Sequence, residues 1–266
     1  MGDGEQVDVA ALLADLRAES EQLDELVAGA GDWQLATPAP GWTIAHQVAH
    51  LAWTDQKAHL ALTDAEGFRA EVERALDDVG GYVDRGAELG AAREPADLLA
   101  QWRQGRADLA EALAEAPQGT RVPWYGPPMG VVSMITARLM ETWAHGQDVA
   151  DALGARREPT DRLRHIARLG VRTRDFAYSA NGMAPPEEKF HVELTGPSGE
   201  VWDFGPKHVS DRVTGPALDF CLVATQRRHP DDTELVVSGA GAQQWISIAQ
   251  TFAGPPGKGR APGELR

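Results

Sequence analysis

Cysteine and positive charge are both scarce in this chain of 266 residues. The single cysteine, Cys221, excludes an internal disulfide and fits a reducing compartment, so we expect a cytoplasmic protein. Lysine and arginine number 25 against 40 aspartate and glutamate residues, and the net charge of −15 makes nucleic acid and anionic membranes unexpected partners. No apolar run approaches about 18 residues, and no basic start precedes an apolar stretch, so neither a membrane span nor a signal peptide is expected.

Apolar residues recur at helical spacing through most of the first 155 residues. Stretches rich in Gly and Pro interrupt the pattern at 29–41 and 117–130, and Thr43 is placed to cap a helix. A Gly-containing stretch at 85–93 is expected to separate a further pair of helices. These signals predict helices over residues 7–28, 43–64, 67–88, 94–116 and 131–153. We expect residues 1–155 to form an antiparallel helical bundle.

Strand patterns appear only in the remainder of the chain. FHVELTG (190–196) alternates apolar and polar residues, and GEVWDFG (199–205) follows a Pro-Ser turn, which predicts a β-hairpin. Residues 156–253 are therefore predicted to form a small α+β domain, followed by a flexible tail over 254–266, and the fold class is α+β overall. The other elements predicted here are helices at 160–178, 214–228 and 241–252 and a strand at 233–239.

Histidine and glutamate side chains recur at a spacing that suits metal binding. His46 and His50 lie four residues apart in one predicted helix, and Glu141 and His145 lie four apart in another. Side chains at this spacing share a helix face. Glu141 and His145, joined by a histidine from a second helix, would give two imidazoles and one carboxylate, which leaves coordination positions open for catalysis.

Periodicity alone favours a simpler interpretation of the helix at 131–153. Its apolar stripe lies on one side, and the polar residues Arg138, Glu141, His145 and Asp148 cluster on the other. Such a face is typical of a solvated helix surface with local ion pairs. From spacing alone, the solvated face is the stronger of the two interpretations.

A family resemblance changes this balance. GWTIAHQVAHLAW (41–53) resembles the second helix of the DinB-like metal enzymes, with its Gly-Trp-Thr start and His-Leu-Ala end. ARLMETWAHGQDVADALG (137–154) is similar to the Glu-x-x-x-His-Gly-x-Asp-Val stretch of their mycothiol-dependent maleylpyruvate isomerase branch. The resemblance covers about residues 7–253. It extends to TPAPGWT, VPWYGPPMG and, more loosely, VTGPALDFCLVATQRR and VSGAGAQQW.

The resemblance implies a DinB-like four-helix bundle with His50, Glu141 and His145 as metal ligands and zinc as the metal. The same ligands also suit iron, nickel or manganese. It further implies mycothiol as a thiol cofactor and a small electrophile as the substrate. A bound divalent cation lowers the pKa of a thiol, which is the physical reason that a thiol cofactor suits such a site. Isomerisation of a double bond and transfer of the sulfur to the electrophile are both open.

Several other residues admit two interpretations. Arg227 and Arg228 either grip a carboxylate of the substrate, as the resemblance suggests, or cap a helix C-terminus. Trp124 and Tyr125 either line a ligand pocket or pin their loop to the core. Asp148 either orients the His145 ring or lies on the helix surface, and His46 is predicted to be exposed. Trp42 and Trp143 are predicted to be core residues. Cys221 is predicted to be buried and inert.

Other functions also remain open. A metal-binding protein of stress response or detoxification would keep the site without turnover, and a hydrolase would use metal-bound hydroxide with no thiol. The oligomeric state is expected to be a monomer or a homodimer.

Overall fold

The computed structural model describes residues 8–77, 80–117 and 119–264 and divides the chain into two compact units, Met1–Arg156 and Arg157–Arg266. The predicted helix start at Val7 lies outside the described residues. Helices in both units and a four-stranded sheet in the second confirm the α+β class. No helix within the described ranges is long and apolar enough to cross a bilayer.

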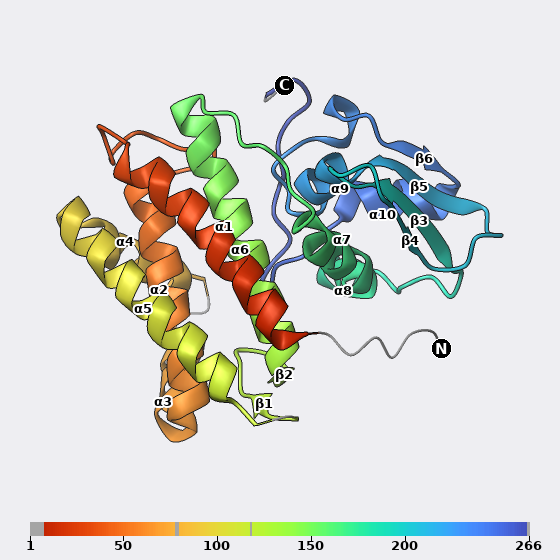
Figure 1. Cartoon of the computed structure of the whole chain (residues 1–266). Helices are drawn as coiled ribbons and strands as arrows, with labels where there is room; N and C mark the ends of the chain where they lie inside the picture. The colour runs from red at the N-terminus through yellow and green to blue at the C-terminus, as the bar shows by residue number, and fades with distance from the viewer. Residues whose placement is uncertain (1–7, 78–79, 118, 265–266) are drawn as a thin grey trace. The chain divides into compact units, whose positions relative to one another are not determined.

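Four long helices lie side by side in the first unit (Figure 1). They are α1 (Val9–Ala28), α2 (Ile44–Thr63), α5 (Pro95–Glu115) and α6 (Val131–Leu153). Two shorter helices, α3 (Ala65–Leu76) and α4 (Tyr82–Ala91), pack against α2, and the loop before α6 contains a small hairpin of β1 (Arg121–Val122) and β2 (Met129–Gly130). The predicted helical bundle is therefore confirmed.

Helix α2 lies at the centre of the bundle because its apolar side chains contact the helices around it. Ile44, Val48 and Leu51 are fully buried, together with Trp102 of α5. Burying one such side chain is worth roughly 1.5–3 kcal/mol relative to leaving it in water. The core therefore fixes which face of α2 is turned toward α6.

The predicted helix over 67–88 is wrong in its length. The structure has α3 ending at Leu76 and α4 running from Tyr82 to Ala91, so the expected break at 85–93 falls largely inside a helix. Gly86 and Gly90 are packing residues rather than breakers. A Cβ atom on Gly90 would lie 2.7 Å from Cβ of Ala49, so glycine permits the close approach of α4 to α2.

The second unit is built on a mixed sheet in the order β4-β3-β5-β6. Strands β3 (Phe190–Thr195) and β4 (Val201–Phe204) form the predicted antiparallel hairpin, β5 (Asp211–Pro216) runs parallel to β3, and β6 (Val236–Ser238) runs antiparallel to β5. The helical elements of this unit are α7 (Leu163–Arg172), α8 (Arg174–Ala180), α9 (Ala217–Ala224), the 3-10 turn η1 (Pro230–Asp232) and α10 (Ala240–Ile248).

Two predicted helices of this unit are wrong in extent. The helix expected over 160–178 is divided into α7 and α8 at Thr173, and the one expected over 214–228 begins as strand β5. Pro216 explains the second error because its fixed φ ends the strand, while its lack of an N–H suits a helix start. The segment after α10 has no regular element among its described residues, and Arg260 within it is 9% exposed.

Candidate metal centre

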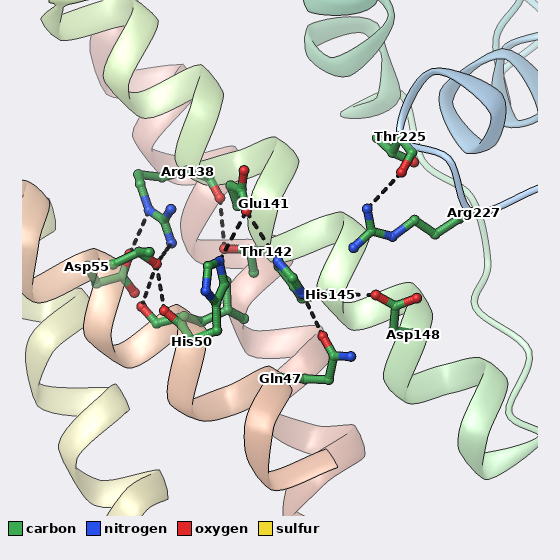
Figure 2. A network of polar contacts seen from close by, with 12 residues as sticks. Gln47, His50, Asp55, Arg138, Glu141, Thr142, His145, Asp148, Thr225 and Arg227 are labelled. Carbon is green, nitrogen blue, oxygen red and sulfur yellow. Dashed lines mark hydrogen bonds and ion pairs between the residues drawn. The ribbon is translucent and has the colours of Figure 1, made fainter. Parts of the chain in front are cut away.

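Three potential ligand atoms from two helices converge in the first unit (Figure 2). His50 lies on α2, and Glu141 and His145 lie one turn apart on α6. Nε2 of His50 lies 3.5 Å from Oε2 of Glu141, and Nε2 of His145 lies 3.2 Å from the same oxygen. All three ligand atoms lie within 4.8 Å of one another, so the fold brings the three residues named from the sequence to one point.

The donor set fits a small divalent cation. Ligand atoms about 2.0–2.1 Å from a tetrahedral ion lie roughly 3.3–3.4 Å from each other, close to the observed separations of 3.2 and 3.5 Å. Burial opposes ionisation of Glu141, but hydrogen bonds with His145 and His50 hold the pKa of its carboxyl well below its usual range. The carboxylate that a cation needs is therefore the form present at neutral pH.

Gln47 fixes the orientation of the His145 ring. Nδ1 of His145 lies 2.5 Å from Oε1 of Gln47, while Nε2 of Gln47 donates to Oγ1 of Thr37 at 2.8 Å. Because the amide oxygen can only accept, Nδ1 of His145 carries the hydrogen. Nε2 is then the ring nitrogen that faces Glu141, and it is the atom that would offer its lone pair to a bound cation.

Trp42 covers the imidazole cluster from the segment that precedes α2. Its ring is stacked on His145 with centroids 5.9 Å apart and tilted against His50 at 5.3 Å. The side chain is only half-buried, so the prediction of Trp42 as a core residue is wrong. An aromatic face at this place excludes water from one side of the two imidazoles.

His46 is held beside Trp42 and is not exposed as predicted. Its side chain is 14% accessible. Nδ1 accepts a hydrogen bond from the backbone N–H of Thr43 at 3.3 Å, and Nε2 lies 2.8 Å from Oε2 of Glu88 on α4. The ring thus takes the place that a Glu or Gln usually holds in a helix capping box, and it ties the start of α2 to α4.

A buried ion pair joins α2 and α6 on the other side of the site. Nε of Arg138 donates to Oδ1 of Asp55 at 2.9 Å, and its Nη2 donates to Oγ1 of Thr54 at 2.8 Å. Arg138 and Asp55 are 3% and 4% exposed, so each charge depends on the other for compensation. The ion pair fixes the spacing of the two helices one turn from Glu141.

The polar face of α6 is therefore not solvated, and that interpretation of its periodicity is wrong. Arg138, His145 and Asp148 are all buried. Asp148 is fully buried rather than at the surface, and its Oδ2 lies 3.9 Å from Nδ1 of His145. This separation exceeds a hydrogen bond, and the bond from Nδ1 goes to Gln47 instead.

Trp124 and Tyr125 lie in an aromatic cluster of the first unit. Trp124 stacks on Phe68 of α3 with centroids 5.7 Å apart, and Tyr125 meets Phe68 and Tyr82 edge to face. Burial, with the neighbouring hydroxyl of Tyr82, raises the pKa of the Tyr125 hydroxyl, so it stays protonated. These contacts pin the loop to α3 and α4, which is one of the two interpretations that the sequence left open.

Arg227, Arg228 and Cys221 belong to the second unit. Nη1 of Arg227 donates to the carbonyl of Thr225, the C-cap of α9, at 2.7 Å. Arg228 lines a cavity of about 390 Å³ with His229 and Lys258. Cys221 is fully buried as expected, and burial raises the pKa of its thiol.

The bundle and its convergent ligands define a helical protein with a candidate site for a divalent cation. The mycothiol maleylpyruvate isomerase N-terminal domain family matches residues 16–150, about half of the chain, and the chain belongs to this family. A second family, described as wyosine base formation, matches residues 186–238.

The chain is also similar to two curated proteins and to two solved structures. Two proteins of Mycobacterium tuberculosis, named uncharacterized protein Rv0036c and uncharacterized protein MT0041, are each 54% identical over 250 residues, which is 93% of this chain and 97% of theirs. Crystal structures of the mycothiol-dependent maleylpyruvate isomerase and a point mutant of it share the fold, with TM-scores of 0.58 and 0.60 at 17% and 16% identity. Each comparison covers 88% of this chain and 95% of the other.

Sequence reasoning missed the residues that support the ligands. Gln47 and Asp55 both lie on α2, and their partners on α6 are 98 and 83 residues away. The one signal in the sequence was spacing, because Gln47 precedes His50 by three residues and therefore shares its helix face.

Proposed function

We propose that this protein is a divalent-metal enzyme that uses mycothiol to act on a small electrophile. Depending on the electrophile, it acts as an isomerase of the maleylpyruvate type or as a thiol S-transferase. The observation that carries the proposal is the convergence of His50, Glu141 and His145 within 4.8 Å in a fold shared with the mycothiol-dependent isomerase. We propose zinc as the metal, and the cytoplasm as the compartment.

His50, Glu141 and His145 would hold the cation, which supplies the positive charge that keeps a thiol deprotonated at neutral pH. The chain's own residues prepare this site. Gln47 directs Nε2 of His145 toward Glu141, and Trp42 excludes water from one side of the imidazoles. Because three protein ligands leave room for a fourth group, the site suits binding of a thiolate.

The fate of the thiol adduct distinguishes the two activities. Addition of the thiolate to an activated double bond, followed by elimination of the same thiolate, returns the thiol and isomerises the substrate. Addition without elimination leaves the sulfur on the product. We further propose that Arg227 and Arg228 bind a carboxylate of the electrophile and that Trp124 and Tyr125 line a pocket for the cofactor, because paired guanidinium hydrogen bonds and aromatic faces suit these roles.

The first test is metal analysis of the purified protein beside the variants His50→Ala and His145→Ala. We expect about one equivalent of metal at this centre in the parent and a loss of at least tenfold in affinity in each variant. His59→Ala is the matched control because His59 lies on the same helix but outside the cluster. Equal metal content in all four proteins would contradict the proposal.

The second test incubates the metal-loaded protein with mycothiol and maleylpyruvate and then with a panel of other electrophiles. A rearranged acid indicates isomerisation, and a stable adduct indicates transfer. Turnover without any thiol would favour a metal-dependent hydrolase instead. Tight metal binding with no turnover on any substrate would favour a metal-binding protein of stress response or detoxification.

A further inference from the structure

His191 is a fully buried histidine in the second unit whose ring faces two carboxylates. It lies on β3 and is 0% exposed. Its Nε2 lies 3.4 Å from Oδ1 of Asp203 and 3.8 Å from Oε2 of Glu193. Neither ring nitrogen has a hydrogen-bond partner among the residues that the structure describes. Burying an imidazole without hydrogen bonds costs free energy, so the His191 ring calls for a partner other than the protein groups around it.

The strand register places the two carboxylates side by side. Glu193 of β3 is paired with Asp203 of β4, and His191 shares the face of Glu193 because alternate residues of a strand point the same way. Like charges directly opposite each other on neighbouring strands destabilise a sheet. A cation between them would remove this repulsion and at the same time give Nε2 of His191 a partner.

The groups around the cluster leave this place open to a cation. Nζ of Lys207 lies 3.0 Å from Oδ2 of Asp203, which leaves Oδ1 turned toward His191. Arg212 of β5 is the neighbour of His191 by register, but its Nη1 donates to the backbone carbonyl of Lys207 at 2.7 Å. Within the described residues, neither the Lys207 ammonium group nor the Arg212 guanidinium group therefore forms a hydrogen bond with Nε2 of His191 or Oε2 of Glu193.

We propose that His191, Glu193 and Asp203 form a second divalent-metal site on the β3–β4 hairpin, separate from the centre in the helical bundle. One imidazole and two carboxylates suit a first-row cation such as Zn²⁺ or Mn²⁺. The ligand atoms lie within 4.8 Å of one another, and small rotations of the partly exposed Glu193 and Asp203 side chains bring them to the roughly 3.3 Å spacing of a tetrahedral site. The ion would fasten the two strands together.

The site is tested by Zn²⁺ titration of the full chain after chelation, with bound metal measured by mass spectrometry. The background is His50→Ala/His145→Ala, so that the centre in the bundle does not contribute. In this background we expect about one equivalent of bound Zn²⁺, and the further substitution Asp203→Asn should weaken the affinity by about tenfold or more. Asp203 is partly exposed, so its substitution is compatible with folding even where His191→Ala is not.

Two matched controls guard against surface binding by this acidic chain. Glu187→Gln removes an exposed carboxylate outside the cluster and should leave the affinity unchanged. Lys207→Gln removes the competing ammonium group but keeps Asp203, so the affinity should stay equal or rise.

The same titration followed by nitrogen NMR should shift the Nε2 resonance of His191. The proposal is overturned if Asp203→Asn and Glu187→Gln bind Zn²⁺ equally well, if Lys207→Gln weakens binding, or if the His191 resonance does not respond. Each of these results would mean that the cluster does not hold a cation. The background variant keeps this outcome distinct from any failure of the function proposed above.

Discussion

Gln47 and His145 are 98 residues apart in the chain, yet Oε1 of one lies 2.5 Å from Nδ1 of the other. This contact belongs to an antiparallel register between α2 and α6. Gln47, His50 and Asp55 follow each other along α2, and their respective partners His145, Glu141 and Arg138 follow in the reverse direction along α6. The candidate ligands thus lie between two contacts that hold the helices at a fixed spacing.

The first prediction concerns the orientation of His145. Gln47→Leu keeps the volume of the side chain but removes the oxygen that accepts from Nδ1, so the ring is free to change tautomer or turn. Loss of such a supporting partner typically weakens a metal site by about 10–100-fold. Zn²⁺ affinity, measured by competition with a chelator, checks this. Thr37→Val is the control because it keeps the Gln47 oxygen and removes the acceptor of the Gln47 amide, together with the bond from Oγ1 of Thr37 to the carbonyl of Trp42, and we expect a smaller effect.

The second prediction concerns the buried ion pair. Arg138→Met leaves the Asp55 carboxylate buried without its partner and should cost about 3–5 kcal/mol of unfolding free energy. The double variant Arg138→Met/Asp55→Leu should cost clearly less than the sum of its single changes because no charge is left uncompensated. Urea unfolding of the four proteins measures this coupling. Additive effects would show that the pair does not hold α2 and α6 together.

The third prediction concerns acid stability. A hydrogen bond from Arg103 lowers the pKa of Asp24, burial opposes this shift, and the charge of Arg106 adds to it, so the pKa is below its usual value. Because the pKa of Asp24 is lower in the folded state, its carboxylate stabilises the protein at pH values above the pKa of the unfolded state, about 3.9. This stabilisation is lost as the pH falls through the pKa of the folded state.

Asp24→Asn should therefore lower the unfolding free energy by about 1–2 kcal/mol at pH 7, and this difference should shrink below about pH 4. Urea unfolding from pH 7 to pH 2.5 measures both effects. Glu111→Gln on the exposed side of α5 is the control and should show neither. A deficit in Asp24→Asn that is constant with pH would contradict the assignment.

The fourth prediction separates two helical glycines. Gly90→Ala should destabilise the protein by about 1–3 kcal/mol because its Cβ would lie 2.7 Å from Cβ of Ala49. Gly105 lies in the interior of α5, and a Cβ atom there would have only Cγ of Gln56 nearby, at 3.8 Å. Gly105→Ala should therefore stabilise the protein by up to about 1 kcal/mol. Thermal unfolding compares the two. Equal effects would mean that α4 adjusts its distance from α2.

The general architecture was accessible from the sequence because helical spacing and strand alternation are local signals. The predictions were wrong where contacts with residues far away in the sequence overrode a local pattern. Gly86 and Gly90 are residues typical of a helix break, but here they lie inside a helix. Trp53 and Ala49 of α2 pack so closely against Gly86 and Gly90 that only glycine fits at these two positions. The strand β5 was missed because its pairing with β3 and β6, rather than its own pattern, defines it.

The candidate site shows the same limit. Periodicity placed Arg138, Glu141 and His145 on one face of a helix, and only the family resemblance indicated that this face is not solvated. A single-helix pattern does not show that Asp55, His50 and Gln47 of α2 lie opposite, because that depends on how the bundle closes. The ligand residues were predictable from the family resemblance of the two helix motifs, whereas the residues that support them depend on how the two helices pack.

The spacing of α2 and α6 is held by the chain's own contacts, namely the Arg138–Asp55 pair, the Gln47–His145 bond and the apolar core of α2. Binding of an ion at the proposed centre would thereby be separate from folding, unlike in small zinc domains that unfold without their metal. Chelation should leave the far-ultraviolet circular dichroism nearly unchanged. If the proposed function holds, such a preformed site would let a cell exchange one divalent cation for another, according to supply, without unfolding the protein.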